Sequence, residues 1–141
     1  MRQHGTWFSA VAGIVLVGFA GLILAQNPAP NPGVTRTVVT QGDLSVAGHE
    51  AVIMHVEIAP GAASGWHTHP GEEITYITDG GISLTIAGQA ARKVAAGEGF
   101  IVPAGAVHNA KNEGPVPAKL VVVYVVEKGK PLRTEARSPA M

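Results

Sequence analysis

The sequence predicts an all-β fold, a small barrel of short antiparallel strands. After residue 31, runs of β-branched residues recur, Gly and Pro separate them, and no stretch keeps the 3.6-residue apolar period of a helix. Short strands at even spacing with turn residues between them are typical of antiparallel sandwiches and barrels. The 141 residues, 46% of them hydrophobic, are enough for one domain with its own core.

The expected strands are taken in chain order from the apolar and alternating runs. They cover residues 34–40, 51–58, 73–78, 82–86, 89–94, 100–102, 107–111 and 119–126. Asp79-Gly80-Gly81 is expected to make a hairpin turn between the third and the fourth. The last strand is apolar at every position from Leu120 to Val126, so we expect cover on both faces, inside the barrel and from a second layer or a partner subunit.

The N-terminus has the pattern of a targeting segment. Arg2 gives a positive start, residues 7–25 carry no charge, and a Pro-rich break follows. We expect a helix over residues 1–25 that is either a signal peptide cleaved after Ala25 or a retained membrane anchor, because the run is nearly long enough to span a bilayer. The protein would then be periplasmic or secreted, or anchored in the inner membrane and facing the periplasm. The remaining boundaries are a linker at 26–33, the barrel domain at 34–127 and a C-terminal tail at 128–141.

Composition excludes several classes of partner and site. Ten Lys and Arg balance ten Asp and Glu, and no basic cluster stands out, which argues against binding to nucleic acid. The chain has no Cys, so neither a disulfide framework nor a thiolate metal site can form. Any metal ion must therefore be held by His and carboxylate side chains.

Four residues form a candidate metal site. His67 and His69 lie two apart, so on an extended segment both rings point the same way. Pro70-Gly71 then turns the chain, and Glu73 opens the returning strand close to both rings. His108, just after the turn at residues 103–105, would complete a set of three imidazoles and one carboxylate.

The spacing of these residues resembles the two-motif signature of the cupin superfamily. The first motif places Gly61, His67, His69, Glu73 and Gly80 at the family intervals. The second motif places Gly97, Pro103, Gly105, His108 and Asn112 in the same way. The resemblance implies a small jelly-roll-like β-barrel over about residues 35–127, with one divalent metal ion held by His67, His69, Glu73 and His108. It also implies a homodimer.

Imidazole and carboxylate ligands suit Fe, Mn, Ni, Co, Cu or Zn as the divalent ion, and the sequence leaves its identity open. The first functional hypothesis is a metal-dependent enzyme, similar to the small quercetin-dioxygenase-like cupins and dioxygenase- or isomerase-like in its reaction. It would act on a small oxygenated organic molecule, with Glu73 as catalytic base. The alternative is a binding module that senses or sequesters a metal or a small metabolite in the cell envelope, without turnover.

Strand alternation indicates which neighbours share the face of the metal site. Thr75 and Ile77 lie on the Glu73 face, and Phe100 and Val102 are expected near the pocket. By the same rule Glu72 and Tyr76 point away from the metal. No second conspicuous acid or base accompanies Glu73 in the two motifs.

Overall fold

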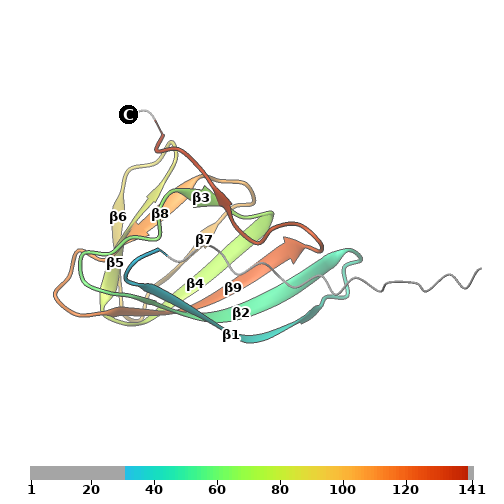
Figure 1. The fold of residues 1–141 in the computed structure, drawn as a ribbon, viewed down its shortest axis with the longest axis horizontal. Coiled ribbons are helices and arrows are strands. Elements are labelled where there is room, and N and C mark those ends of the chain that lie inside the picture. The colour runs from blue at the N-terminus through green and yellow to red at the C-terminus, as the bar shows by residue number, and fades with distance from the viewer. Residues whose placement is uncertain (1–30, 140–141) are drawn as a thin grey trace, which may run out of the picture.

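The computed structural model describes residues 31–139, and these residues form two five-stranded antiparallel sheets that lie face to face (Figure 1). The first, sheet A, has the strand order β1-β2-β9-β4-β7, and the second, sheet B, has the order β10-β3-β8-β5-β6. The strands are β1 (Val34–Asp43), β2 (His49–Ile58), β3 (His67–Thr68), β4 (Gly71–Asp79), β5 (Gly81–Ile86), β6 (Arg92–Ala95), β7 (Gly99–Val102), β8 (His108–Lys111), β9 (Ala118–Glu127) and β10 (Thr134–Glu135). The predicted all-β barrel is confirmed.

Alternation along each strand divides its side chains between the core and the outside. In β4 every second residue from Gly71 to Ile77 is buried, and the residues between them are exposed. In β9 every second residue from Ala118 to Val126 is buried. The inward residues of both sheets meet in one core, and each buried Val, Ile or Leu contributes about 1.5–3 kcal/mol of hydrophobic stabilisation.

The turn at Asp79-Gly80 differs from the expected hairpin. The strand before it, β4, pairs with β7 and β9 in sheet A, whereas β5 after it pairs with β6 and β8 in sheet B. Gly80 has φ +67°, and a Cβ there would lie 2.6 Å from the carbonyl oxygen of Pro117. The turn therefore carries the chain from one sheet to the other, and only glycine fits its conformation and its close approach.

Strand β9 lies in the middle of sheet A, between β2 and β4, so its backbone is paired along both edges. Its outward side chains Val121, Val123 and Val125 are half-buried. Beside them on the outer face, Tyr76 and Ile101 are 52% and 60% exposed. The inner face of the strand is covered by the core as expected, and the outer face is an apolar surface.

Both ends of the chain bear on the sequence predictions. The expected signal or anchor at 1–25 and most of the linker at 26–33 lie outside the described residues. Between residues 31 and 139, no helix is long and apolar enough to cross a membrane. Beyond β9, part of the expected tail returns to sheet B, where β10 pairs with β3.

Candidate metal centre

Strands from both sheets bring the four predicted ligands together. His67 lies on β3 and is paired across the ladder with His108 on β8, both in sheet B. After His69 the chain crosses at Pro70 into β4 of sheet A, which carries Glu73. All four side chains are buried between the sheets. His67, His69, Glu73 and His108 are called the histidine–glutamate cluster below.

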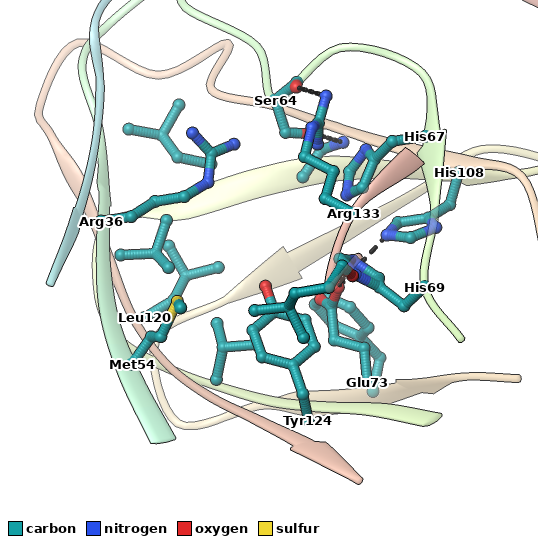
Figure 2. A pocket seen from close by; sticks show the side chains of 16 residues that line it. Arg36, Met54, Ser64, His67, His69, Glu73, His108, Leu120, Tyr124 and Arg133 are labelled. Atoms are coloured by element: carbon teal, nitrogen blue, oxygen red, sulfur yellow. Dashed lines mark hydrogen bonds and ion pairs between the residues drawn. The ribbon is translucent and has the colours of Figure 1, made fainter. Parts of the chain in front are cut away.

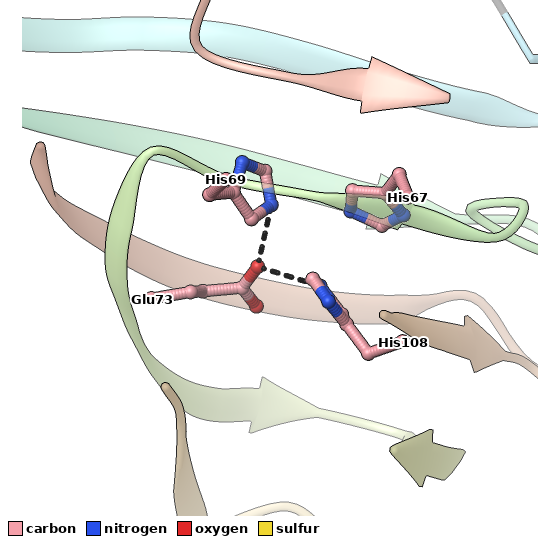
Figure 3. A group of neighbouring side chains, drawn as sticks. All are labelled: His67, His69, Glu73 and His108. Atoms are coloured by element: carbon pink, nitrogen blue, oxygen red, sulfur yellow. Dashed lines mark hydrogen bonds and ion pairs between the residues drawn. The ribbon is translucent and has the colours of Figure 1, made fainter. Parts of the chain in front are cut away.

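The ligand atoms of the cluster converge on one point (Figure 3). One ligand atom from each of the four residues lies within 4.8 Å of all the others. Glu73 Oε2 is 3.1 Å from His69 Nε2 and 3.2 Å from His108 Nε2. Its other oxygen, Oε1, accepts a hydrogen bond of 2.8 Å from the Thr75 hydroxyl. The arrangement has the ligand types and the compactness that a single transition-metal ion requires.

Backbone carbonyls fix the orientation of the three rings. His67 Nδ1 donates to the carbonyl oxygen of Gly65 at 2.7 Å, and His108 Nδ1 donates to that of Ala106 at 3.0 Å. His69 Nδ1 donates to the carbonyl oxygen of Leu132 at 2.5 Å. Because a carbonyl oxygen can only accept, each Nδ1 must carry the hydrogen, and each neutral ring keeps its Nε2 lone pair for the interior of the site.

These tautomers create a conflict that a cation removes. Neutral His69 and His108 would each direct an Nε2 lone pair at the Glu73 carboxylate, which also offers only lone pairs. The contacts become favourable if the rings take up a second hydrogen and donate it, or if a metal ion lies among the four groups. His69 Nε2, which is buried, has no hydrogen-bond partner in the described part of the chain. The residues therefore fit a metal ion.

The electrostatics of the site follow from its burial. Burial, followed by the neighbouring His108, lowers the pKa of His67 to about 2, so this ring is neutral and able to bind a metal. Burial alone would raise the pKa of Glu73, but the adjacent imidazoles of His108 and His69 hold it well below its usual range. Glu73 is thus an ionised ligand. Burial and the Glu73 charge raise the pKa of Tyr124, which keeps its phenol protonated.

The cluster forms one wall of a cavity between the sheets (Figure 2). About 30 Å³ of this cavity is open to the centres of water molecules, room for a ligand of only a few heavy atoms. Met54, Leu120 and Val122 contribute apolar walls. The polar lining outside the cluster is Arg36, Ser64, Tyr124 and Arg133.

The sequence prediction of the surroundings is right in part. Phe100 lines the cavity, and Thr75 is buried and holds Glu73. Ile77 and Val102 are buried in the core and do not line the cavity. Glu72 is exposed on the opposite face of β4, as alternation predicts.

Sequence reasoning missed all four of these polar residues, Arg36, Ser64, Tyr124 and Arg133. Arg36 lies two residues after buried Val34 on β1 and therefore points to the same, inward face. A cation on an inward face is unusual, and this could have identified Arg36 from the sequence. Tyr124 is one of the buried residues of β9, whose other members are apolar, and this position could have identified it in the same way. No sequence pattern could have identified Arg133, because its position depends on the return of the C-terminal segment to β3.

Comparisons with known proteins agree with this architecture. Residues 54–124 match the family described as the cupin domain. The polyketide synthase protein TcmJ of Streptomyces glaucescens is 30% identical over 109 residues, covering 74% of this chain and 71% of TcmJ.

Nectarin-1 of the hybrid Nicotiana langsdorffii x Nicotiana sanderae is 29% identical over 114 residues, which are 75% of this chain. This chain spans only 50% of the length of that nectarin. Among solved structures, an oxalate oxidase in complex with the substrate analogue glycolate is 27% identical, with a TM-score of 0.59 over 87% of this chain and 65% of the oxidase. With the two facing sheets and the buried cluster, these similarities show that the chain belongs to the cupin family.

Proposed function

We propose that this protein is a mononuclear metal-dependent enzyme that acts on a small oxygenated organic molecule, with dioxygenase- or isomerase-like chemistry. The observation that carries the proposal is the histidine–glutamate cluster, in which three carbonyl-anchored rings surround one ionised carboxylate and the ligand atoms lie within 4.8 Å of one another. Three imidazoles and a carboxylate suit Fe, Mn, Ni, Co, Cu or Zn in the divalent state. With four protein ligands, an octahedral ion would keep two positions for other groups.

The roles of the residues follow from their positions around the cavity. A bound divalent ion would supply Lewis-acid polarisation of a substrate oxygen. Glu73 is the one carboxylate among the described residues that line the cavity, so we assign to it the proton removed from the substrate. Thr75 holds the other oxygen of Glu73, and the walls formed by Leu120 and Val122 keep bulk water away from the reacting groups.

The names of similar proteins support the substrate class. One relative is a polyketide synthase protein, and one similar structure is an oxalate oxidase with glycolate bound. Both names concern small or oxygen-bearing organic compounds. The small cavity favours a small compound within this class.

Product formation separates an enzyme from a binding module. The full chain, loaded in turn with each candidate metal, would be incubated in air with a panel of small hydroxy, keto and phenolic compounds and analysed by mass spectrometry. We expect one compound to be converted, and Glu73→Gln to abolish its conversion. Glu72→Gln, a change of the exposed neighbour, should leave the rate unchanged. Saturable binding of several compounds with no product from any of them would contradict the enzyme and support the sensing or sequestering alternative.

We also propose a homodimer formed through the outer face of sheet A. Ile74 lies beside Val123 on one side and Ile101 on the other, and Tyr76 lies beside Val121, which makes one continuous apolar surface. Such surfaces are typical of association sites. Light scattering should give twice the chain mass for the native protein and the single chain mass for Ile101→Glu. A monomeric native protein would contradict this arrangement.

For its location we propose export directed by residues 1–25. The uncharged run and the positive start support it. The protein would be recovered from fractions of a Gram-negative host and its mass determined. We expect either a chain shortened by the signal peptide in the periplasm or the intact chain in the inner membrane. Recovery of the intact chain from the cytosol would contradict export.

A further inference from the structure

Two arginine side chains enter the cavity from different parts of the fold, next to the histidine–glutamate cluster (Figure 2). Arg36 comes from β1, where it is paired with the inward-facing Val56. Arg133 comes from the C-terminal segment, one residue after Leu132, whose carbonyl anchors His69. The cavity therefore combines a candidate metal site with two permanent positive charges.

The guanidinium of Arg133 is held in place but is not fully paired. Its side chain is only 3% exposed. Its Nε donates to Glu135 Oε1 at 2.8 Å, and its Nη2 donates to the carbonyl oxygen of Ser64 at 2.7 Å. Its Nη1 is buried and has no hydrogen-bond partner in the described residues. Because an unpaired buried donor is costly, this nitrogen indicates a missing acceptor.

Arg36 has no ion-pair partner among residues 31–139. Burial, followed by repulsion from Arg133, lowers its pKa, so the two guanidinium groups act on each other across the cavity. The Glu73 carboxylate is already engaged by His69 and His108. The partner of Arg133, Glu135, is 61% exposed and neutralises it only from the outside.

A bound metal ion would increase this excess of positive charge. A divalent ion held by three neutral imidazoles and one carboxylate keeps a net positive charge, and the two guanidinium groups add to it. A planar guanidinium with a free nitrogen matches the geometry of a carboxylate. A neutral ligand would leave both the charge and the Nη1 donor unsatisfied.

We propose that the cavity binds a small carboxylate anion that carries a second oxygen. The carboxylate pairs with Arg133 Nη1 and with Arg36, and the second oxygen is directed toward the histidine–glutamate cluster. This inference rests on the proposed function and narrows its substrate class. The space of about 30 Å³ that is open to the centres of water molecules limits the anion to a few heavy atoms, as in a two- or three-carbon hydroxy or keto acid.

The test compares glycolate, the smallest hydroxy acid, with glycolamide, which keeps its shape but lacks the charge. Both would be titrated calorimetrically into the full chain loaded with Zn²⁺, which has no redox chemistry, at constant ionic strength. We expect glycolate to bind at least about tenfold more tightly than glycolamide. Arg133→Met and Arg36→Met should each reduce glycolate affinity about tenfold or more, with the zinc content unchanged.

Two further variants keep the result interpretable. Arg137→Met removes an exposed arginine from the same C-terminal segment and should leave glycolate affinity unchanged. Arg133→Lys keeps the charge but loses the forked geometry, so it should lie between the native protein and Arg133→Met. If Arg133→Met does not fold, Arg36→Met and Arg133→Lys decide the question.

Equal binding of glycolate and glycolamide, or native glycolate affinity in Arg36→Met and in the folded Arg133 variants, would overturn the inference while leaving the metal site intact. Failure of the native chain to retain zinc or any other of the candidate ions would instead overturn the metal-dependent function. The same titration on the metal-free chain would then decide the inference by itself. Glycolate binding that requires the arginines would support it, and no binding would overturn it.

Discussion

At the scale of single residues, the histidine–glutamate cluster depends on groups that do not belong to it. Three backbone carbonyls, of Gly65, Ala106 and Leu132, hold the Nδ1 hydrogens of the three rings. The Thr75 hydroxyl holds Glu73 Oε1. Such contacts fix the tautomer and the orientation of each ligand before a metal arrives, which lowers the cost of binding it.

The hydroxyl of Thr75 offers a direct measure of this support. Thr75→Val keeps the shape of the side chain but removes the 2.8 Å hydrogen bond to Glu73. We expect metal affinity, measured by competition with a chelator, to fall by about 10- to 100-fold. Thr78→Val is the control, because the Thr78 hydroxyl on the same strand is exposed and donates to the carbonyl oxygen of Lys119 on β9, away from the cluster. Equal metal affinity in both variants would show that Thr75 does not support the site.

The neutral state of His67 predicts how the stability of the metal-free protein depends on pH. Its pKa falls from 6.5 in the unfolded chain to about 2 in the folded protein, so below pH 6.5 the unfolded state binds a proton that the folded state does not. The free energy of unfolding should therefore decrease as pH falls, with a contribution approaching about 1.4 kcal/mol per pH unit below pH 6. The lowered pKa of Glu73 acts in the same direction, but only near and below its ordinary value of 4.5.

Urea denaturation of the metal-free protein between pH 7 and pH 5 measures how the free energy of unfolding changes with pH. This interval lies above the pH at which Glu73 contributes. His67→Gln, which cannot take up the proton, should lose the His67 contribution. The same slope in the native protein and in this variant would contradict the assignment.

Residue spacing identifies the cluster from sequence but not the arginines beside it. The two-residue spacing of His67 and His69 and the turn before Glu73 place three candidate ligands by local geometry alone. The fourth predicted ligand, His108, is confirmed as a neighbour by its cross-strand pairing with His67. Arg133 enters the cavity through a long-range contact, the return of the C-terminal segment, and no local pattern encodes such a contact.

At the scale of secondary structure, the passage from β3 to β4 decides where Glu73 lies. His69 stands at the end of the sheet B segment and Gly71 begins β4 in sheet A, so the two sides of the site come from one short crossing. A Cβ on Gly71 would lie 1.9 Å from the carbonyl oxygen of Val125 on β9. The close approach of β4 to β9 at this point therefore requires glycine.

Gly71→Ala tests the tightness of that crossing. The added methyl group must push β4 away from β9, so we expect a loss of about 1–3 kcal/mol of unfolding free energy, measured by chemical denaturation of the metal-free protein. Gly42→Ala is the matched control, because nothing lies within 4 Å of its added Cβ and its φ is not positive. Equal stability of the two variants would show that the crossing can widen without cost.

The longer strands were predictable from sequence, whereas two short ones were not. Strands β2, β4, β5 and β9 each have several alternating or β-branched residues, and their predicted bounds differ from the observed ones by at most two residues at either end. Strand β3 has two residues and so does β10, too few for any period to show. The turn at Asp79-Gly80 has the composition of a hairpin, but which strands pair after it is decided by the packing of the two sheets.

At the scale of the whole molecule, the fold buries a polar cluster between two apolar sheets. Burying ionisable groups costs free energy unless each is paired. Here backbone carbonyls and Thr75 satisfy the outer atoms of the cluster, and the inner atoms face one another. A metal ion would satisfy those inner atoms and would so offset the cost of placing them at the centre of the fold.

The most direct test of this account is the metal content of the untagged full chain, purified without chelators and measured by plasma mass spectrometry. We predict close to one transition-metal ion per chain, and its loss in His67→Ala and in His108→Ala. His55→Ala, which removes an exposed histidine from β2, should retain the metal. A native chain that contains no metal and takes none up on incubation with each candidate ion would contradict the account.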